Sequence, residues 1–404
     1  MSALVERNPM RGAVPQPPVI GPATAFHRKF ADYQPTPLFD LAVTAGELGI
    51  GHLLLKDESN RLGLPAFKML GAAWASYCAL IDVLGHEPEW STLEELGEKL
   101  APIQPMSLAT ATDGNHGRAV ASFARRIGLS ARIFVPSGTS DARIAAIEGE
   151  GASCEVVDGS YEDAVARASE EAAADCLVIS DTAWEGYEVI PATVIEGYST
   201  IFAEIGDQLA AAGLSRPDAV VIPMGVGALA AATSQWYRRP GPAEDTILIG
   251  VEPRSANCVQ VSAMAGELTE VPGPHRSIMA GLNCGLPSPV AWPWVSGGFD
   301  WFVAIDDDDA EDAMRSLAAL GVVSGETGAA SLGALRAIGS LADLGLSSES
   351  TVLVISTEGA TDPAFFEHAV GRTAMQVAAE SPACVAAGVN PGACPIARCP
   401  GTCR

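Results

Sequence analysis

Lysine is scarce in this sequence, which has only four among its 404 residues, at Lys29, Lys56, Lys68 and Lys99. Chemistry that needs a lysine amine therefore has few candidates. Positive charge as a whole is also in short supply, because 24 lysines and arginines stand against 49 aspartates and glutamates, a net charge of −25. So acidic a chain repels nucleic acids and anionic membranes, and we expect neither as a partner.

Charged residues make up only 18% of the chain and hydrophobic residues 48%, which excludes general disorder and allows a large core. The length of 404 residues favours two cores or one two-lobed body. The amino-terminal segment lacks the apolar core of a signal peptide. The uncharged stretch 219–237 is long enough to span a membrane, but Pro223, Gly225 and Gly227 interrupt it. These features predict a cytoplasmic protein.

No cysteine pair has the spacing of a common zinc or redox motif, so we expect no metal site. Five cysteines are scattered and are expected to be reduced and buried: Cys78, Cys154, Cys176, Cys258 and Cys284. Four more crowd into the last 21 residues: Cys384, Cys394, Cys399 and Cys403. We expect residues 373–404 to form a poorly ordered tail. A disulfide, metal-binding or crosslinking role for its cysteines stays an open alternative.

Short apolar runs alternate with helical stretches along most of the chain. Strands are expected at 52–56, 107–110, 131–135, 153–157, 177–180, 219–223, 247–252, 301–305 and 351–356. Helices are expected at 66–84, 116–127, 141–148, 161–174, 192–212, 228–237, 309–320 and 328–344. This alternation predicts an α/β fold with two lobes, each built on a parallel sheet covered by helices. The site is expected in the cleft between the lobes.

Lys68 has the most distinctive setting of the four lysines, near the start of a helix of apolar and small residues. A surface side chain that snorkels to water is the simpler interpretation. The alternative is a nucleophilic amine, because burial lowers the pKa of a lysine and frees its lone pair. Lys56 lies at the end of a strand, where a structural salt bridge is the simpler interpretation.

Two loops that connect a strand to a helix are suited to bind anions. Residues 109–117 read Ala-Thr-Ala-Thr-Asp-Gly-Asn-His-Gly, and residues 223–229 read Pro-Met-Gly-Val-Gly-Ala-Leu. Backbone amides at a helix N-terminus attract carboxylates and phosphates, and glycines permit close approach. Helix capping by Thr112 or Asp113 is an equally simple explanation of the first loop. The second loop also fits a dinucleotide fingerprint with Glu252 as the ribose-binding acid, so a nicotinamide dehydrogenase competes.

Polar residues also follow two other apolar strands, at Asp181 and at Ser356 and Thr357. Seen alone, Asp181 is as well explained as a helix cap. Taken together, a lysine nucleophile, an anion loop with Asn115 and a separate glycine-rich loop favour pyridoxal phosphate as the cofactor. The dehydrogenase hypothesis gives Lys68 and the Asn115 loop no role.

These segments resemble the tryptophan-synthase-β-like family of pyridoxal-phosphate enzymes (fold type II) and, within it, the diaminopropionate ammonia-lyases. The resemblance runs from about residue 33 to 372 and is specific at 110–118, 181–187, 279–282 and 356–359. Serine and threonine dehydratases are similar more loosely, usually with serine in place of Asp113. We accordingly expect a larger domain, 1–65 with 186–372, that binds the cofactor phosphate, and a smaller domain, 66–185, that carries the substrate carboxylate loop.

The resemblance implies a role for each matching residue. Lys68 would hold the cofactor covalently, Asn115 would hydrogen-bond its 3-hydroxyl, and Ser356 or Thr357 would face its ring nitrogen. Asp113 and Asp181 would be the acidic catalytic residues. The cofactor phosphate would lie on Gly225, Val226, Gly227, Ala228 and Leu229. The substrate carboxylate would lie on the amides of Thr112, Asp113, Gly114, Asn115 and His116.

The reaction that the resemblance implies is the α,β-elimination of a small amino acid, 2,3-diaminopropionate, to pyruvate and ammonia. A carboxylate suits the second amine of this substrate. Lys68 and Asp113 could take the Cα proton from opposite faces, which would let both isomers react. A serine or threonine dehydratase or a β-replacement enzyme of the same fold is the alternative, and a non-catalytic amino-acid-binding regulator is an alternative of another class. The family also suggests a homodimer.

Overall fold

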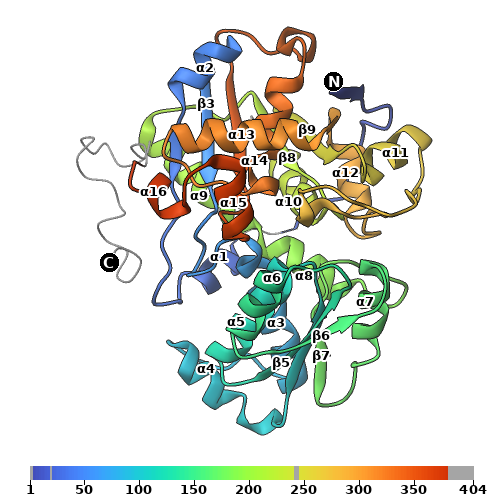
Figure 1. Ribbon diagram of the computed structural model, residues 1–404. Helices are drawn as coiled ribbons and strands as arrows, with labels where there is room; N and C mark the ends of the chain where they lie inside the picture. Colours follow the sequence, from blue (N-terminus) through green and yellow to red (C-terminus); the bar gives the residue numbers. More distant parts are fainter. Residues whose placement is uncertain (1–2, 19–20, 241–244, 381–404) are drawn as a thin grey trace.

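The computed structural model describes residues 3–18, 21–240 and 245–380. Two β-sheets lie in the two halves of the molecule, each surrounded by helices (Figure 1). The larger sheet has seven strands, in the order β1 (Leu4–Arg7), β10 (Trp301–Ile305), β9 (Ile247–Pro253), β8 (Ala219–Pro223), β11 (Thr351–Ser356), β3 (His52–Asp57) and β2 (Leu38–Asp40). The smaller sheet has four, in the order β6 (Ser153–Val157), β5 (Ser130–Pro136), β4 (Ser107–Ala111) and β7 (Cys176–Val178).

All strands in the interior of the sheets are parallel, as the alternation of strands and helices predicts. The edge strands β1 and β2 are antiparallel to their neighbours, and neither is among the predicted strands. They have only four and three residues, too few for a periodic pattern to stand out. The prediction of an α/β fold with two parallel sheets covered by helices is therefore confirmed, and the structure adds one short antiparallel strand at each edge of the larger sheet.

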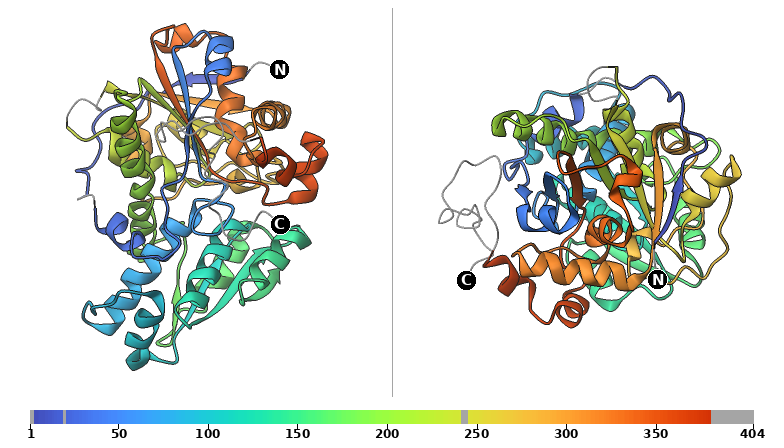
Figure 2. Two further views of the ribbon diagram at one scale, coloured as in Figure 1. Left: turned by 90° about the vertical axis from the view of Figure 1, so that its left-hand side faces the viewer. Right: turned by 90° about the horizontal axis from the view of Figure 1, so that it is seen from above.

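Helices cover both faces of the larger sheet (Figure 2). Along β8, Val220 and Ile222 belong to one hydrophobic core, and Ala219 and Val221 belong to the other. This period of two is the geometry of a strand, and burial on both faces explains why β8 is apolar throughout. The first core includes α8 (Val189–Gly197), α9 (Ser199–Ala212), α10 (Ala228–Tyr237) and α12 (Trp292–Gly298), and the second includes α2 (Ala42–Leu48), α13 (Asp307–Ala319), α14 (Glu326–Ala337) and α15 (Pro363–Val370).

The smaller sheet is also covered on both faces. Helices α3 (Lys68–Leu84) and α5 (Asn115–Arg126) pack on one face, and α7 (Tyr161–Ser169) packs on the other. The predicted boundaries of the smaller domain, 66 and 185, enclose its four strands and stay a prediction. The remaining helices are α1 (Pro22–His27), α4 (Leu93–Lys99), η1 (Ala101–Ile103), α6 (Asp141–Glu148), α11 (Cys258–Ala265), η3 (Ala280–Leu282), η4 (Leu341–Leu344) and α16 (Ala374–Ala378).

The long helix expected over 192–212 is two helices, α8 and α9, which meet at Tyr198. The last residue of α8, Gly197, lies against the start of α3, where a Cβ atom would be 2.6 Å from the carbonyl oxygen of Leu70. Only glycine permits this approach. Gly197 therefore allows α8 to lie close to the first turn of the helix that begins with Lys68.

The first residues of the predicted tail, 373–404, are helical, which contradicts the expectation of poor order there. Residues 374–378 form helix α16, which starts with a capping box between Thr373 and Gln376. Val377 of this helix is fully buried in the second core. The rest of the predicted tail, residues 381–404 with its four cysteines, lies outside the described residues.

A buried ionic cluster fixes the segment between β3 and Lys68. Lys56 Nζ donates to Glu204 Oε2 of α9 at 2.7 Å, which confirms the salt bridge expected for Lys56. Arg61 donates to Glu204 Oε1 at 2.6 Å and to Glu58 Oε1 at 2.7 Å. All four side chains are buried. Because two cations face two anions, the cluster is balanced in charge, and removing one member leaves an unpaired buried charge.

We expect Glu204→Gln to lower the free energy of unfolding at pH 7 by about 3–5 kcal/mol, because Lys56 and Arg61 lose their shared counter-charge. Burial raises the pKa of Glu204, but these two cations outweigh it and hold the pKa at about 2, below the ordinary 4.5. The stabilisation is therefore fully present above pH 4.5 and is lost as the pH falls toward 2. Urea unfolding of both proteins across this pH range measures the difference.

The matched control is Asp207→Asn on the same helix. The Asp207 side chain is 76% exposed and pairs with Arg28 only at 3.4 Å, so we expect almost no change in stability. Equal effects of the two substitutions, or a Glu204→Gln effect that does not diminish at low pH, would contradict this account of the cluster.

Candidate active site

Most of the residues that the sequence predicts for the site line one cavity. Its lining includes the start of α3, the loop before α5, the loop after β7 and the loop between β8 and α10. The predicted residues that line it are Lys68, Asp113, Asn115, Asp181, Gly225, Val226, Gly227, Ala228, Leu229 and Thr357. Four predicted residues do not line it: Thr112, Gly114, His116 and Ser356. The cavity lies at the carboxyl ends of the strands, where parallel sheets usually bind ligands.

Lys68 and Asp181 form an ion pair inside this cavity. Lys68 Nζ donates to Asp181 Oδ2 at 2.6 Å, and the side chains are 20% and 7% exposed. The backbone before Lys68 is held by the end of the larger sheet, because the amide of Phe67 donates to the carbonyl of Thr357. A snorkelling surface lysine is therefore excluded.

The pKa of Lys68 differs from the prediction. Burial lowers it, as expected from the sequence, but the negative charge of Asp181 outweighs burial and raises the pKa above its ordinary value. Burial likewise raises the pKa of Asp181, but the positive charge of Lys68 outweighs it and holds that pKa well below its usual range. Both groups are therefore charged while they are paired. Neither the distance between Lys68 and Asp181 nor the direction of the resulting pKa shift of Lys68 can be predicted from the sequence.

Two further side chains surround Asp181. Tyr161, the first residue of α7, donates from its hydroxyl to Asp181 Oδ1 at 3.2 Å. His116 Nε2 donates to the carbonyl of Ile179 at 2.7 Å, and its Nδ1 lies 3.9 Å from Asp181 Oδ2. Burial lowers the pKa of His116, so the ring is neutral and fixes the backbone just before Asp181. Tyr161 is a residue that sequence reasoning missed.

Asp113 is the second acid of the cavity and has no hydrogen-bond partner among the described residues. Burial raises its pKa, although the positive charges of Arg143 and Lys68 oppose the shift. Arg143, on α6, is held by Glu326 at the start of α14, with Nη2 2.9 Å from Oε1. A partly buried carboxyl with a raised pKa and no fixed partner is suited to accept or donate a proton.

Only some backbone amides of the loop predicted to hold the substrate carboxylate are free to bind a ligand. The amide of Thr112 donates to Phe134 in the strand ladder, and the amide of Gly114 donates to the hydroxyl of Thr112 at 2.9 Å. These two amides are satisfied within the protein, so the prediction that all five amides bind the ligand needs correction. The cavity is lined by Asp113 and Asn115, at the N-terminus of α5.

The glycine-rich loop fits a phosphate. A Cβ atom at Gly225 would lie 2.7 Å from the carbonyl oxygen of Gly281, and Gly227 has a φ of +96°. Both positions therefore require glycine. Helix α10 begins directly afterwards without a side-chain cap, so the amides of its first turn are open to an anion.

Glu252 has a different role from the one in the dehydrogenase hypothesis. Its carboxylate accepts the amides of Val259 and Gln260, both at 2.8 Å, at the start of α11. The side chain is 1% exposed. It therefore caps a helix and is not open to a ribose, which removes the acid on which that hypothesis depended.

Of the residues predicted to contact the cofactor ring, Thr357 and Asn115 line the cavity and Ser356 does not. Ser356 donates its hydroxyl to Ser324 at 2.8 Å and does not line the cavity. Thr357 lines it, and its buried Oγ1 has no hydrogen-bond partner among the described residues. Asn115 also lines it, with its amide nitrogen donating to Glu358 Oε2. An amine, an open helix N-terminus and an unpaired hydroxyl in one cavity fit pyridoxal phosphate.

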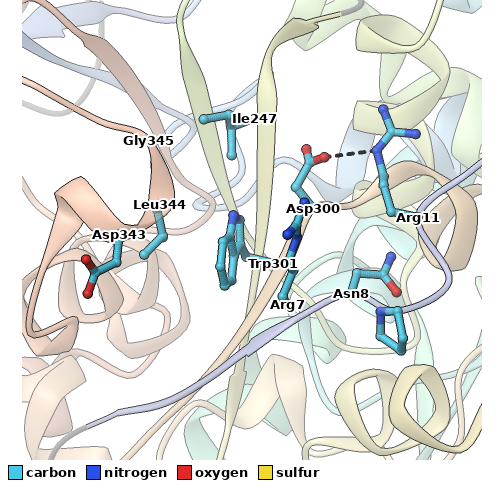
Figure 3. A pocket seen from close by; sticks show the side chains of 10 residues that line it. Arg7, Asn8, Arg11, Ile247, Asp300, Trp301, Asp343, Leu344 and Gly345 are labelled. Atoms are coloured by element: carbon cyan, nitrogen blue, oxygen red, sulfur yellow. Dashed lines mark hydrogen bonds and ion pairs between the residues drawn. The ribbon is translucent and has the colours of Figure 1, made fainter.

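A second, wider depression lies at the opposite, amino ends of β9 and β10 (Figure 3). In this view Trp301 lies between Leu344 and Asp300, and Arg11 Nε pairs with Asp300 Oδ1 at 2.9 Å. None of the predicted site residues lines it. In the part of the chain that the structure describes, no cluster of potential ligands could hold a metal ion, and no helix is both long and apolar enough to cross a membrane.

Comparisons with known proteins agree with this geometry. Residues 30–358 match the family described as "Pyridoxal-phosphate dependent enzyme". The chain is 38% identical to diaminopropionate ammonia-lyase of Escherichia coli K12 over 86% of this chain and 90% of that protein. It is 31% identical to a rat L-serine dehydratase/L-threonine deaminase, but over 43% of this chain and 45% of that one.

Among solved structures, the fold is similar to diaminopropionate ammonia-lyase from Escherichia coli in complex with an aminoacrylate-PLP azomethine reaction intermediate. The TM-score is 0.82 at 34% identity, over 91% of this chain and 96% of that chain. The similarity therefore extends over nearly the whole length of both proteins.

Proposed function

The chain belongs to the family of pyridoxal-phosphate-dependent enzymes, and from that premise we propose that it eliminates ammonia from 2,3-diaminopropionate. The observation that carries the proposal is the presence of two acids, Asp113 and Asp181, in one cavity with Lys68. A substrate with a second amine gives a carboxylate a cation to hold, which the hydroxyl of serine or threonine does not. The 38% identity to diaminopropionate ammonia-lyase supports the same choice.

Residues of the cavity would hold the cofactor at three points. Lys68 provides the amine for covalent attachment, the amides of Gly227 and the first turn of α10 hold the phosphate, and the Thr357 hydroxyl serves the ring nitrogen. When bound, pyridoxal phosphate supplies an electron sink for the negative charge left at Cα. Asn115 and the open amides at the N-terminus of α5 orient the substrate carboxylate.

Proton transfer at Cα is assigned to Lys68 Nζ and the Asp113 carboxylate. The pKa of Asp113 is raised by burial, which makes its ionised form a stronger base. Lys68 begins α3 and Asp113 lies in the loop before α5, so the cavity receives the two groups from separate elements, which supports two separate bases. One base would serve the L-isomer and the other the D-isomer.

Asp181 is assigned to the second amine of the substrate. In the structure its Oδ2 accepts a hydrogen bond from the Lys68 ammonium at 2.6 Å, and this contact with an alkylammonium supports the assignment. When Lys68 is occupied by the cofactor, this oxygen is available to the substrate, and Tyr161 still fixes the other oxygen. The released 2-aminoacrylate hydrolyses, so that one substrate and one water give pyruvate and two molecules of ammonia.

Steady-state assays with the holoenzyme test the proposal. Release of 2-oxo acid is measured side by side with D- and L-2,3-diaminopropionate, L-serine and L-threonine. We expect kcat/KM for diaminopropionate to exceed that for serine and threonine by at least about 100-fold, because the hydroxyl substrates leave a buried carboxylate without its cation. A higher kcat/KM with serine or threonine would assign the chain to the dehydratases instead.

Three further proposals concern the whole protein: a homodimer, a cytoplasmic location, and two domains divided at residues 66 and 185. The five described cysteines are all free thiols, which supports a reducing compartment. Sedimentation of the holoenzyme tests the dimer. A monomer at micromolar concentration would overturn it.

A further inference from the structure

The segment that carries Asp181 is anchored at two points that the proposed mechanism does not use. We call residues 180–187, between β7 and α8, the Asp181 loop. Tyr187 anchors it from within, and Ser288 anchors it from the chain before α12. Neither residue lines the cavity.

Tyr187 holds the backbone on both sides of Ile179. Its hydroxyl donates to the carbonyl of Val178 at 2.6 Å and accepts the amide of Ser180 at 3.0 Å. The ring stacks on Trp184, with centroids 4.0 Å apart and planes within 8°. Burial raises the pKa of Tyr187, so the hydroxyl keeps its proton and stays a donor. Ser180, the residue immediately before Asp181, is therefore fixed by a side chain that lies seven residues further along the chain.

Ser288 connects the Asp181 loop to the glycine-rich loop. Its hydroxyl oxygen accepts the amide of Ala183 at 3.2 Å. Its own amide donates to the carbonyl of Val226 at 2.9 Å. Ser288 is 1% exposed, so water does not compete for these bonds. A single buried residue thus contacts the loop proposed to hold phosphate and the loop that presents the acid.

We propose that Tyr187 and Ser288 are positioning residues for Asp181, and that Ser288 transmits binding at the glycine-rich loop to the Asp181 loop. An anion on the amides of Gly227 and α10 orders the backbone around Val226, and hence the carbonyl that fixes Ser288. The Ser288 hydroxyl then restricts Ala183, two residues after Asp181. The inference rests on the proposed phosphate site but not on the identity of the substrate.

Hydrogen exchange on the full-length chain, freed of cofactor, tests the connection directly. The probe is pyridoxine 5′-phosphate, which carries the phosphate but no aldehyde that could react with Lys68. In the unsubstituted protein we expect the probe to slow exchange in peptides that cover 223–229 and 178–187. In Ser288→Ala, protection of 223–229 should remain, because the phosphate still binds, and protection of 178–187 should be lost.

Two other variants separate positioning from general stability. Tyr187→Phe keeps the stacked ring and should speed exchange of 178–187 with and without the probe, while probe-dependent slowing persists. Ser296→Ala removes a hydroxyl that bonds Trp292 within α12 at 2.8 Å and should behave like the unsubstituted protein. In the holoenzymes, Ser288→Ala and Tyr187→Phe should lower kcat by at least about tenfold, because small displacements of a catalytic group are costly. The affinity for pyridoxal phosphate should change much less.

Unchanged probe-dependent protection of 178–187 in Ser288→Ala would overturn the connection through Ser288. If that variant does not fold, Tyr187→Phe decides the positioning claim, and exchange equal to that of the unsubstituted protein would overturn it. Because exchange needs only the phosphate-bearing probe, these outcomes are independent of whether diaminopropionate is the substrate.

Discussion

Lys68→Ala should remove both the visible absorbance of the bound cofactor and the release of pyruvate, with kcat reduced by at least about 10³-fold. Of the four lysines, Lys68 is the one whose amine lines the cavity, beside the glycine-rich loop and the unpaired Thr357 hydroxyl. Absorbance spectra after gel filtration with excess pyridoxal phosphate measure attachment, and the pyruvate assay measures turnover.

Lys99→Ala is the matched control, because Lys99 is exposed at the end of α4 and does not line the cavity. It should leave the spectrum and kcat unchanged. A Lys68→Ala protein that is folded and retains the absorbance of a covalently bound cofactor would show that another lysine holds it. That result would contradict the geometry of the site as a whole.

Asp113→Asn should suppress the reaction of D-2,3-diaminopropionate by about 10²-fold or more and reduce that of the L-isomer much less. The asparagine keeps the size of the side chain but cannot accept a proton. Lys68 remains in place to serve the other isomer. The measurement is kcat and KM for both isomers in the variant and the unsubstituted enzyme.

Asp181→Asn provides the comparison within the same cavity. Because Asp181 is assigned to the second amine, which both isomers carry, its loss should reduce both reactions to a similar extent. If Asp113→Asn reduced kcat/KM equally for the two isomers, the assignment of two separate bases would be contradicted. If Asp113→Asn reduced the reaction of the L-isomer alone, Asp113 would serve the L-isomer and Lys68 the D-isomer.

Much of the fold could be predicted because buried parallel strands leave a clear signal in the sequence. The strands at 153–157, 219–223, 301–305 and 351–356 have the predicted bounds. The edge strands β1 and β2 were missed because they are short and only partly apolar. The sequence predicts one helix over 192–212, because no residue type in this stretch marks the boundary between α8 and α9 at Tyr198.

The site could be predicted where a residue type is rare or a motif is dense, as at Lys68, Asn115 and Gly225. Residues that contact the site from distant parts of the chain show no recognisable pattern in the sequence. Tyr161 begins an ordinary capped helix, and Ser288 lies in an irregular segment, yet they contact Asp181 and Ala183 across the fold. The raised pKa of Lys68 was also beyond prediction, because it depends on the 2.6 Å distance to Asp181.

The most direct measurement of the central claim is the ratio of ammonia to pyruvate released from 2,3-diaminopropionate by the holoenzyme. Elimination of the second amine followed by hydrolysis predicts two molecules of ammonia for each pyruvate, with the rate abolished in Lys68→Ala. No pyruvate from either isomer under conditions in which L-serine is consumed, or pyruvate release that persists in Lys68→Ala, would contradict the account.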